Sequence, residues 1–155
     1  MREETGTKPT AGGKRGIMAE QINALLVHAQ DGTLLDLTRI LKLLDMKVIC
    51  AGSCREASQH LQKQGAVDMV FAGTHLRDGG WSDVLRLAQQ SKRYVPVIVV
   101  SSMVDGGLYL DAIGRGAFDF VAPPFLASDL AHVVRSAIYK ELLSVKQDMV
   151  TPPAA

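Results

Sequence analysis

Few side chains in this 155-residue sequence have the types and spacing that catalysis or metal binding requires. The two cysteines, Cys50 and Cys54, are too few for a disulfide framework, and no histidines lie near them at zinc-finger spacing. The glycine-rich stretches match neither a Gly-x-Gly-x-x-Gly fingerprint nor a Walker loop. The motifs therefore give no support to nucleotide binding, and we expect reduced thiols in a cytoplasmic protein.

The composition is that of an ordinary globular protein, with 47% hydrophobic and 21% charged residues and a formal net charge of +1. So small a charge argues against strong electrostatic binding to nucleic acid or to an anionic membrane. No apolar run approaches the ~20 residues that a membrane-spanning helix needs. We therefore expect one folded domain, no membrane segment and no direct binding to nucleic acid.

The elements that must position any functional residue alternate regularly. Short apolar runs rich in Val and Ile, typical of strands buried on both faces, occupy residues 22–27, 48–51, 69–72, 95–100 and 118–121. The segments between them have helical periodicity, as in the stripe formed by Leu34, Leu37, Leu41 and Leu44. Ser53 and Glu56 have capping-box spacing, and Gly65 and Gly116 lie where helices should end.

This alternation predicts the α/β class, with five βα units forming a doubly wound parallel sheet covered by helices on both faces. In such sheets, ligands bind beyond the carboxyl ends of the strands. The folded domain is expected at residues 21–145. Residues 1–20 read as a disordered leader, and residues 146–155 as a disordered tail or the beginning of a linker.

Three stretches resemble the receiver domain of bacterial two-component response regulators, which has a flavodoxin-like fold. They are residues 25–31, with the first strand and its turn, residues 68–85, with the third strand and its loop, and residues 96–102 together with 116–125. The resemblance extends over about residues 22–143. It implies the strand order 2-1-3-4-5 and a role in phosphorelay signal transduction.

The phosphorylation chemistry of that family does not transfer to this chain. Receivers use an acidic pair that binds a divalent cation, an aspartate that accepts the phosphoryl group, and a lysine that contacts it. By resemblance, the acidic pair falls on His28 and Ala29, the acceptor on Gly73 and the lysine on Pro123. Ser101 keeps the switch hydroxyl. We therefore expect a degenerate pocket with no aspartyl phosphate, no enzymatic activity and no cofactor.

The switch aromatic is also kept, as Phe120, but no other acid is expected to replace the missing acceptor. Asp31 is interpreted as a helix cap or first-turn acid, and Asp78 as part of a turn. Asp68 precedes the third strand and so lies at the wrong end of the sheet.

Two histidines give the alternative hypothesis, a metal or small-ligand sensor. The resemblance places His28 and His75 at the mouth of one crevice, and paired imidazoles suit zinc, copper or nickel. A convincing site needs a third ligand, for which only Asp31 or Asp78 is available. Histidines at loop ends that bond to backbone or water remain the competing interpretation.

The leading hypothesis is a phosphorylation-independent protein-interaction module that binds a signalling protein or an effector domain. Receivers form dimers or contact effectors through their fourth helix, fifth strand and fifth helix. The candidate interface residues, including a possible homodimer contact, are Trp81, Tyr109, Arg115, Arg135 and Tyr139. Trp81 could instead pack across the start of a helix.

Overall fold

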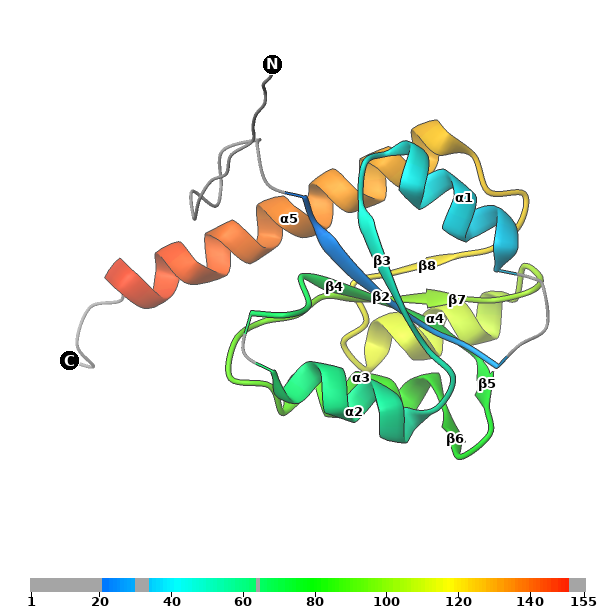
Figure 1. Cartoon of the computed structure of the whole chain (residues 1–155), viewed down its shortest axis with the longest axis horizontal. Helices are drawn as coiled ribbons and strands as arrows, with labels where there is room; N and C mark the ends of the chain where they lie inside the picture. The colour runs from blue at the N-terminus through cyan, green and yellow to red at the C-terminus, as the bar shows by residue number, and fades with distance from the viewer. Residues whose placement is uncertain (1–20, 30–33, 64, 151–155) are drawn as a thin grey trace, which may run out of the picture.

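The computed structural model describes residues 21–29, 34–63 and 65–150, with only the backbone for residues 141–150. A five-stranded sheet forms its centre (Figure 1). The strands are β2 (Asn23–Val27), β3 (Lys47–Ala51), β4 (Met69–Gly73), β7 (Val97–Val100) and β8 (Asp119–Val121). All neighbours pair in parallel in the order β3-β2-β4-β7-β8, which confirms the predicted order 2-1-3-4-5.

Helices cover both faces of this sheet (Figure 1). They are α1 (Leu35–Leu43), α2 (Cys54–Gln62), α3 (Trp81–Gln89), α4 (Gly106–Gly114) and α5 (Ala127–Val150). Helices α1 and α5 share one core cluster, and α2, α3 and α4 contribute to the other. A short hairpin, β5 (His75–Leu76) and β6 (Gly79–Gly80), follows β4.

Alternation along the strands supplies both cores. On β2, Leu25 and Val27 face one cluster, whereas Ala24 and Leu26 face the other, as the two-residue period of a strand requires. Every residue of the central strand β4 is buried. Burial of a side chain such as Leu26 contributes about 2 kcal/mol to stability, so the sheet centre is a rigid platform for the loops at its edges.

The local helix signals are borne out with one difference. Ser53 is the N-cap of α2, and its side chain accepts a hydrogen bond from Glu56 N over 3.2 Å. The Glu56 carboxylate accepts from Gly52 N over 2.7 Å, one residue before the N-cap position that a capping box predicts. Gly65 and Gly116 follow α2 and α4 with φ of 76° and 110°, values that favour glycine.

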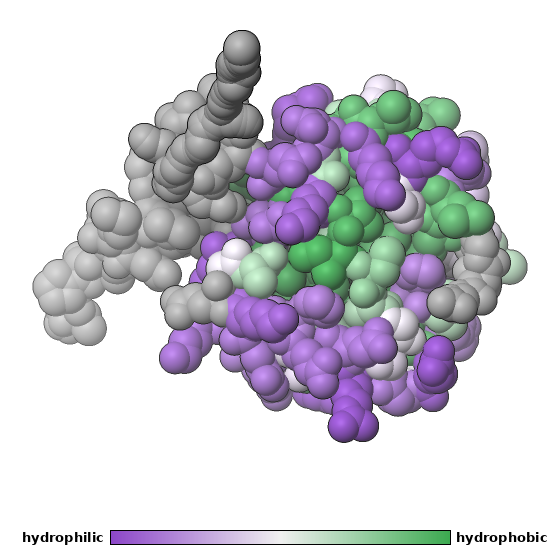
Figure 2. All heavy atoms as spheres, viewed as in Figure 1, coloured by the Kyte–Doolittle hydropathy of each residue, from purple (hydrophilic) through white to green (hydrophobic). Residues whose placement is uncertain are grey.

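The chain departs from prediction at an edge and at an end. Strand β3 forms one edge of the sheet and exposes Lys47 and Cys50, so it is not buried on all sides. Figure 2 shows apolar surface gathering over β3, with hydrophilic surface over α2 below it.

Helix α5 extends to Val150, so residues 146–150, which were assigned to a tail, are helical. Residues 1–20 and 151–155 lie outside the described residues.

None of the helices described is both long enough and apolar enough to cross a membrane.

Candidate functional site

The register of the sheet brings the predicted pocket residues to one edge. Val27 pairs with Ala72, and Gly73 pairs with Val100, so His28, Gly73 and Ser101 all lie where neighbouring strands end. Ser101 N donates to Val121 O over 3.0 Å, which brings the end of β8 to the same edge. Ala29 follows His28, and Pro123 lies two residues beyond β8 and forms a cis peptide bond with Pro124.

Gly73 occupies the last position of β4 and is buried. A Cβ atom built on it would lie 3.3 Å from the carbonyl oxygen of Val27 and 3.5 Å from Cβ of His28. The first of these distances is tighter than an ordinary van der Waals contact, so the strand end of β2 closes this side of the crevice. The position has neither a carboxylate nor free space in this direction.

The two histidines bond to their own neighbours. His28 Nδ1 lies 2.7 Å from Ala29 O, and because a carbonyl can only accept, this nitrogen carries the proton. His75 Nδ1 lies 3.1 Å from the hydroxyl of Thr74, on an exposed side chain. Among the described residues, no three His, Cys, Asp or Glu side chains come together as metal ligands. Asp31, the other suggested ligand, lies outside these residues.

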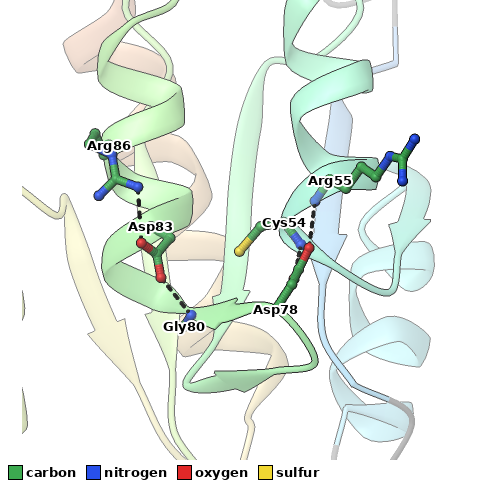
Figure 3. A network of polar contacts seen from close by, with 6 residues as sticks. All are labelled: Cys54, Arg55, Asp78, Gly80, Asp83 and Arg86. Atoms are coloured by element: carbon green, nitrogen blue, oxygen red, sulfur yellow. Dashed lines mark hydrogen bonds and ion pairs between the residues drawn. The ribbon is translucent and has the colours of Figure 1, made fainter.

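Asp78 ties the hairpin after β4 to the next helix (Figure 3). Its two carboxylate oxygens accept hydrogen bonds from Cys54 N over 2.7 Å and from Arg55 N over 3.1 Å. These N–H groups belong to the first turn of α2 and have no partner within the helix. The hydrogen bonds, that from Cys54 most of all, lower the pKa of Asp78. The predicted turn residue is therefore also a helix cap acting across 24 residues of sequence.

Asp83 closes the same network from α3 (Figure 3). Its carboxylate accepts from Gly80 N over 2.9 Å and from Arg86 over 3.0 Å, and these bonds lower its pKa. A Cβ atom on Gly79 would lie only 2.5 Å from this carboxylate, so the hairpin needs glycine there.

Burial, with the nearby charge of Asp78, raises the pKa of the Cys54 thiol to about 11. The thiol therefore remains protonated and is a poor nucleophile at neutral pH.

The two predicted switch residues, Ser101 and Phe120, have local partners. Ser101 is buried, and its hydroxyl donates to Met103 O over 2.7 Å while accepting from Met103 N over 3.2 Å. Phe120 is half-buried against the core and meets the ring of Tyr109 edge-to-face, with 5.9 Å between centroids. The hydroxyl and the aromatic ring are thus both held by the β7–α4 segment.

The interface candidates separate into buried and exposed groups. Trp81 begins α3 and is only 8% exposed, so it packs in the core and is not a surface anchor. The guanidinium of Arg115 lies 5.8 Å from the centre of its ring and also bonds to Asp111 over 2.8 Å. Tyr109, Arg135 and Tyr139 are exposed on α4 and α5. The interface interpretation of Trp81 was therefore wrong, and the packing interpretation is correct.

Sequence reasoning identified Tyr109 but missed the other exposed apolar residues around α4. We define the α4 surface as five exposed side chains on this helix and the loop before it: Met103, Val104, Tyr109, Leu110 and Ile113. Val104 is 82% exposed and Leu110 is 70% exposed, whereas Ala112 is the buried residue of the helix. The available signal was an excess of apolar residues in 108–113, more than one face of a short helix can bury.

No family model and no curated protein matches this chain. Many solved structures do match it, among them a response regulator receiver domain protein from Clostridium thermocellum, with a TM-score of 0.69 and 21% identity over 79% of this chain and 98% of that one. The non-phosphorylated HemR receiver domain from Leptospira biflexa has a TM-score of 0.62 and 21% identity, over 87% and 100%.

The receiver domain of a sensor histidine kinase from Pseudomonas aeruginosa, with magnesium in its active-site cleft, has a TM-score of 0.67 and 19% identity over 77% of this chain and 99% of that one. Identities at this level establish the fold and leave the chemistry to the residues themselves. The chain has the α/β fold of response regulator receiver domains.

Proposed function

We propose that this chain is a signal-transduction module that works without phosphorylation and binds a protein partner through the α4 surface. The observation that carries the proposal is a contrast within one fold. Gly73 ends β4 with no side chain, while the α4 surface exposes Met103, Val104 and Leu110 to solvent at 64%, 82% and 70%.

The first part of the proposal, that the chain is not phosphorylated, follows from the charges that phosphoryl transfer needs. Phosphoryl transfer needs positioned charges that stabilise the transferring group and a cation that neutralises it. By resemblance, the three key positions hold His28, Gly73 and Pro123, none of which is an acid or a lysine. Two carboxylates that follow β4 in the chain, Asp78 and Asp83, are bound to backbone N–H groups of α2 and of the hairpin.

The second part of the proposal, that the chain binds a protein through the α4 surface, follows from the free-energy cost of exposed apolar surface. Monomeric proteins seldom expose contiguous apolar patches, and such patches mark interaction sites. The α4 surface has a polar border that includes the Asp111–Arg115 ion pair, and an apolar centre with a charged rim is typical of protein interfaces. The exposed Tyr139 and Arg135 on α5 extend the candidate interface beyond this centre.

Phosphodonor treatment tests the first part of the proposal. The purified chain would be incubated with acetyl phosphate and Mg²⁺, and in parallel with beryllofluoride and Mg²⁺, beside a competent receiver domain as positive control. We expect an unchanged intact mass and an unchanged amide NMR spectrum for this chain. A mass gain of one phosphoryl group, or beryllofluoride shifts near Gly73, would contradict the proposal.

A matched pair of leucine variants tests the second part of the proposal. Leu110→Ser removes the centre of the α4 surface, and Leu35→Ser removes a similarly exposed leucine (66%) from α1. Self-association would be measured by sedimentation velocity, and retention of other proteins by affinity capture, with wild type and both variants. We expect binding to be lost in Leu110→Ser and kept in Leu35→Ser. Equal binding by the two variants would overturn the assignment of the surface.

A further inference from the structure

A cavity lies at the amino edge of the sheet, opposite the crevice. It occupies about 350 Å³ between the ends of α2 and α3, within the size range of small-molecule sites. Its lining includes Val67 and Val95, which lead into β4 and β7. A side-chain atom added at Gly65, on its rim, would have no described atom within 4 Å, so the mouth is open there.

The floor of this amino-edge cavity is apolar and firmly held. Leu61, Val67 and Val95 are each less than 10% exposed, and Leu87 is partly buried beside them. The position of Val67 is fixed by Arg93, which donates to its carbonyl oxygen over 2.9 Å. An apolar floor held by core packing can receive a hydrocarbon group without reorganising first.

Among the described residues that line the cavity, three are cations and none is an acid. The polar lining residues are Ser58, Gln62, Lys63, Gln90, Ser91, Lys92 and Arg93. Arg93 pairs with the buried Asp68 over 2.9 Å. Within the part of the chain that the structure describes, neither Lys63 nor Lys92 forms an ion pair. Two positive charges are therefore available at the mouth.

The carboxyl ends of α2 and α3 carry negative partial charges, which oppose the attraction of the lysines for an anion. Lys63 is the C-cap of α2 and Gln90 is the C-cap of α3, so both carboxyl ends of these helices reach the cavity. Each helix end carries about −0.5 of an elementary charge. The two lysines, at +1 each, exceed this total, so the field at the mouth favours an anion.

We propose that the amino-edge cavity binds a small amphipathic carboxylate, with its hydrocarbon chain over Leu61, Leu87 and Val95 and its carboxylate beside Lys63 and Lys92. The apolar floor requires a hydrocarbon group, and the unpaired lysines require a negative charge on the same molecule. This site lies at the opposite edge of the sheet from Gly73, so its occupancy is independent of phosphorylation chemistry.

Octanoate is the probe for this proposal. The full chain, labelled with ¹³C and ¹⁵N, would be titrated with octanoate and, in parallel, with octylammonium and butanoate. We expect saturable methyl shifts at Leu61, Val67, Leu87 and Val95 with octanoate. Octylammonium has the wrong charge, and butanoate lacks four methylenes, so each should bind at least about tenfold more weakly.

Charge variants separate specific binding from general adhesion. Lys63→Gln and Lys92→Gln should each weaken octanoate binding about two- to fivefold, because these lysines are exposed and partly screened. Lys42→Gln, at an exposed position on α1, makes the same change in net charge and should have no effect. Three results would overturn the proposal: shifts that never saturate, shifts centred on the α4 surface, or equal binding by the Lys42 and Lys92 variants.

Discussion

The two edges of the sheet use their polar groups in opposite ways. At the carboxyl edge, Asp78, Ser101 and His28 all bond to backbone groups, Asp78 to the start of α2 and the other two to residues next to them in the chain. At the amino edge, Asp68 and Arg93 form an internal pair, while Lys63 and Lys92, around an open cavity, form no ion pair with any described residue. The rule that ligands bind beyond the carboxyl ends of strands locates a crevice in this fold. The side chains decide whether that crevice has any chemistry.

The loops explain this difference. After β4 the chain forms the β5–β6 hairpin, and Asp78 anchors the hairpin to the first turn of α2, which fixes the loop at this part of the carboxyl edge. At the amino edge, α2 and α3 end side by side, and the chain enters β4 and β7 through Val67 and Val95. Two helix ends with small and polar residues between them leave a hollow where a hairpin would have filled it.

Introducing an acid at the carboxyl edge should have the largest effect on the free energy of unfolding. Gly73→Asp places a carboxylate at a buried position, where the nearest described atoms are the carbonyl oxygen of Val27 and the Cβ and Cα of His28. We expect a loss of about 3 kcal/mol at pH 7, a factor of about 150 in the folding equilibrium, measured by urea denaturation.

The pH dependence of that loss provides its control. Burial raises the pKa of the new carboxyl above its unfolded value of about 3.9, so the loss should shrink as the pH falls towards that value. Gly73→Ala, which adds only Cβ, should cost no more than about 1 kcal/mol. A Gly73→Asp variant as stable as wild type at pH 7 would show that the carboxyl edge is open after all.

Thiol labelling tests whether Cys54, at the start of α2, is shielded from solvent at the carboxyl edge. The pKa of Cys54 rises from 9.0 to about 11, so its thiolate fraction at pH 8 is about 100-fold lower than in the unfolded chain. Iodoacetamide should label the exposed Cys50 in the native protein and label Cys54 at a comparable rate only in urea. Because the folded pKa is raised, stability should also fall between pH 9 and 11. Rapid native labelling of Cys54 would contradict this account.

Substitution of Asp68 at the amino edge should have a smaller effect on the free energy of unfolding. Asp68→Asn weakens the ion pair with Arg93 and the bond from Asn23 N, which spans 2.8 Å. We expect a loss of about 1.5 kcal/mol, roughly tenfold in the folding equilibrium. Asp36→Asn breaks the exposed pair with Arg39 on α1 and should cost less than about 0.5 kcal/mol. Equal costs for the two variants would mean that burial does not strengthen the Asp68 pair.

The smallest effect on stability should come from the α4 surface. Leu110→Ser removes a side chain that is 70% exposed, so the free energy of unfolding should change by less than about 0.5 kcal/mol. Thermal and urea denaturation would measure it beside wild type. A loss above 1 kcal/mol would show that Leu110 packs within the domain, and the α4 surface would no longer be a free interface.

Much of the fold could be predicted because its signals are local. The leucine stripe of 34–44 and the apolar run of 69–72 both mark elements that the structure contains, within a residue or two at each end. The Ser53 cap and the turn at Gly116 depend on neighbours within a few residues, so the sequence carries them. The absence of a carboxylate at position 73 is a property of the sequence alone.

The contents of the site were harder to predict because they depend on contacts between distant segments. Asp78 was assigned to a turn, and nothing in its neighbourhood indicated that it caps a helix 24 residues earlier. Trp81 follows two glycines, which fits a surface anchor as well as a core residue, and only the core cluster that α3 shares with α2 and the sheet buries it. The missed residues of the α4 surface are apolar, and only the packing of α4 on the sheet shows that they stay exposed.

The sequence by itself therefore determined the order of βα units and the residue types at 28, 29, 73 and 123, none of which is an acid or a lysine. Residue type and short-range periodicity suffice for both. The tertiary structure alone decided that Trp81 is buried, that Leu110 is exposed, and that a cavity opens between α2 and α3. Those outcomes depend on which surfaces meet when the helices pack on the sheet, a long-range condition that no local pattern contains.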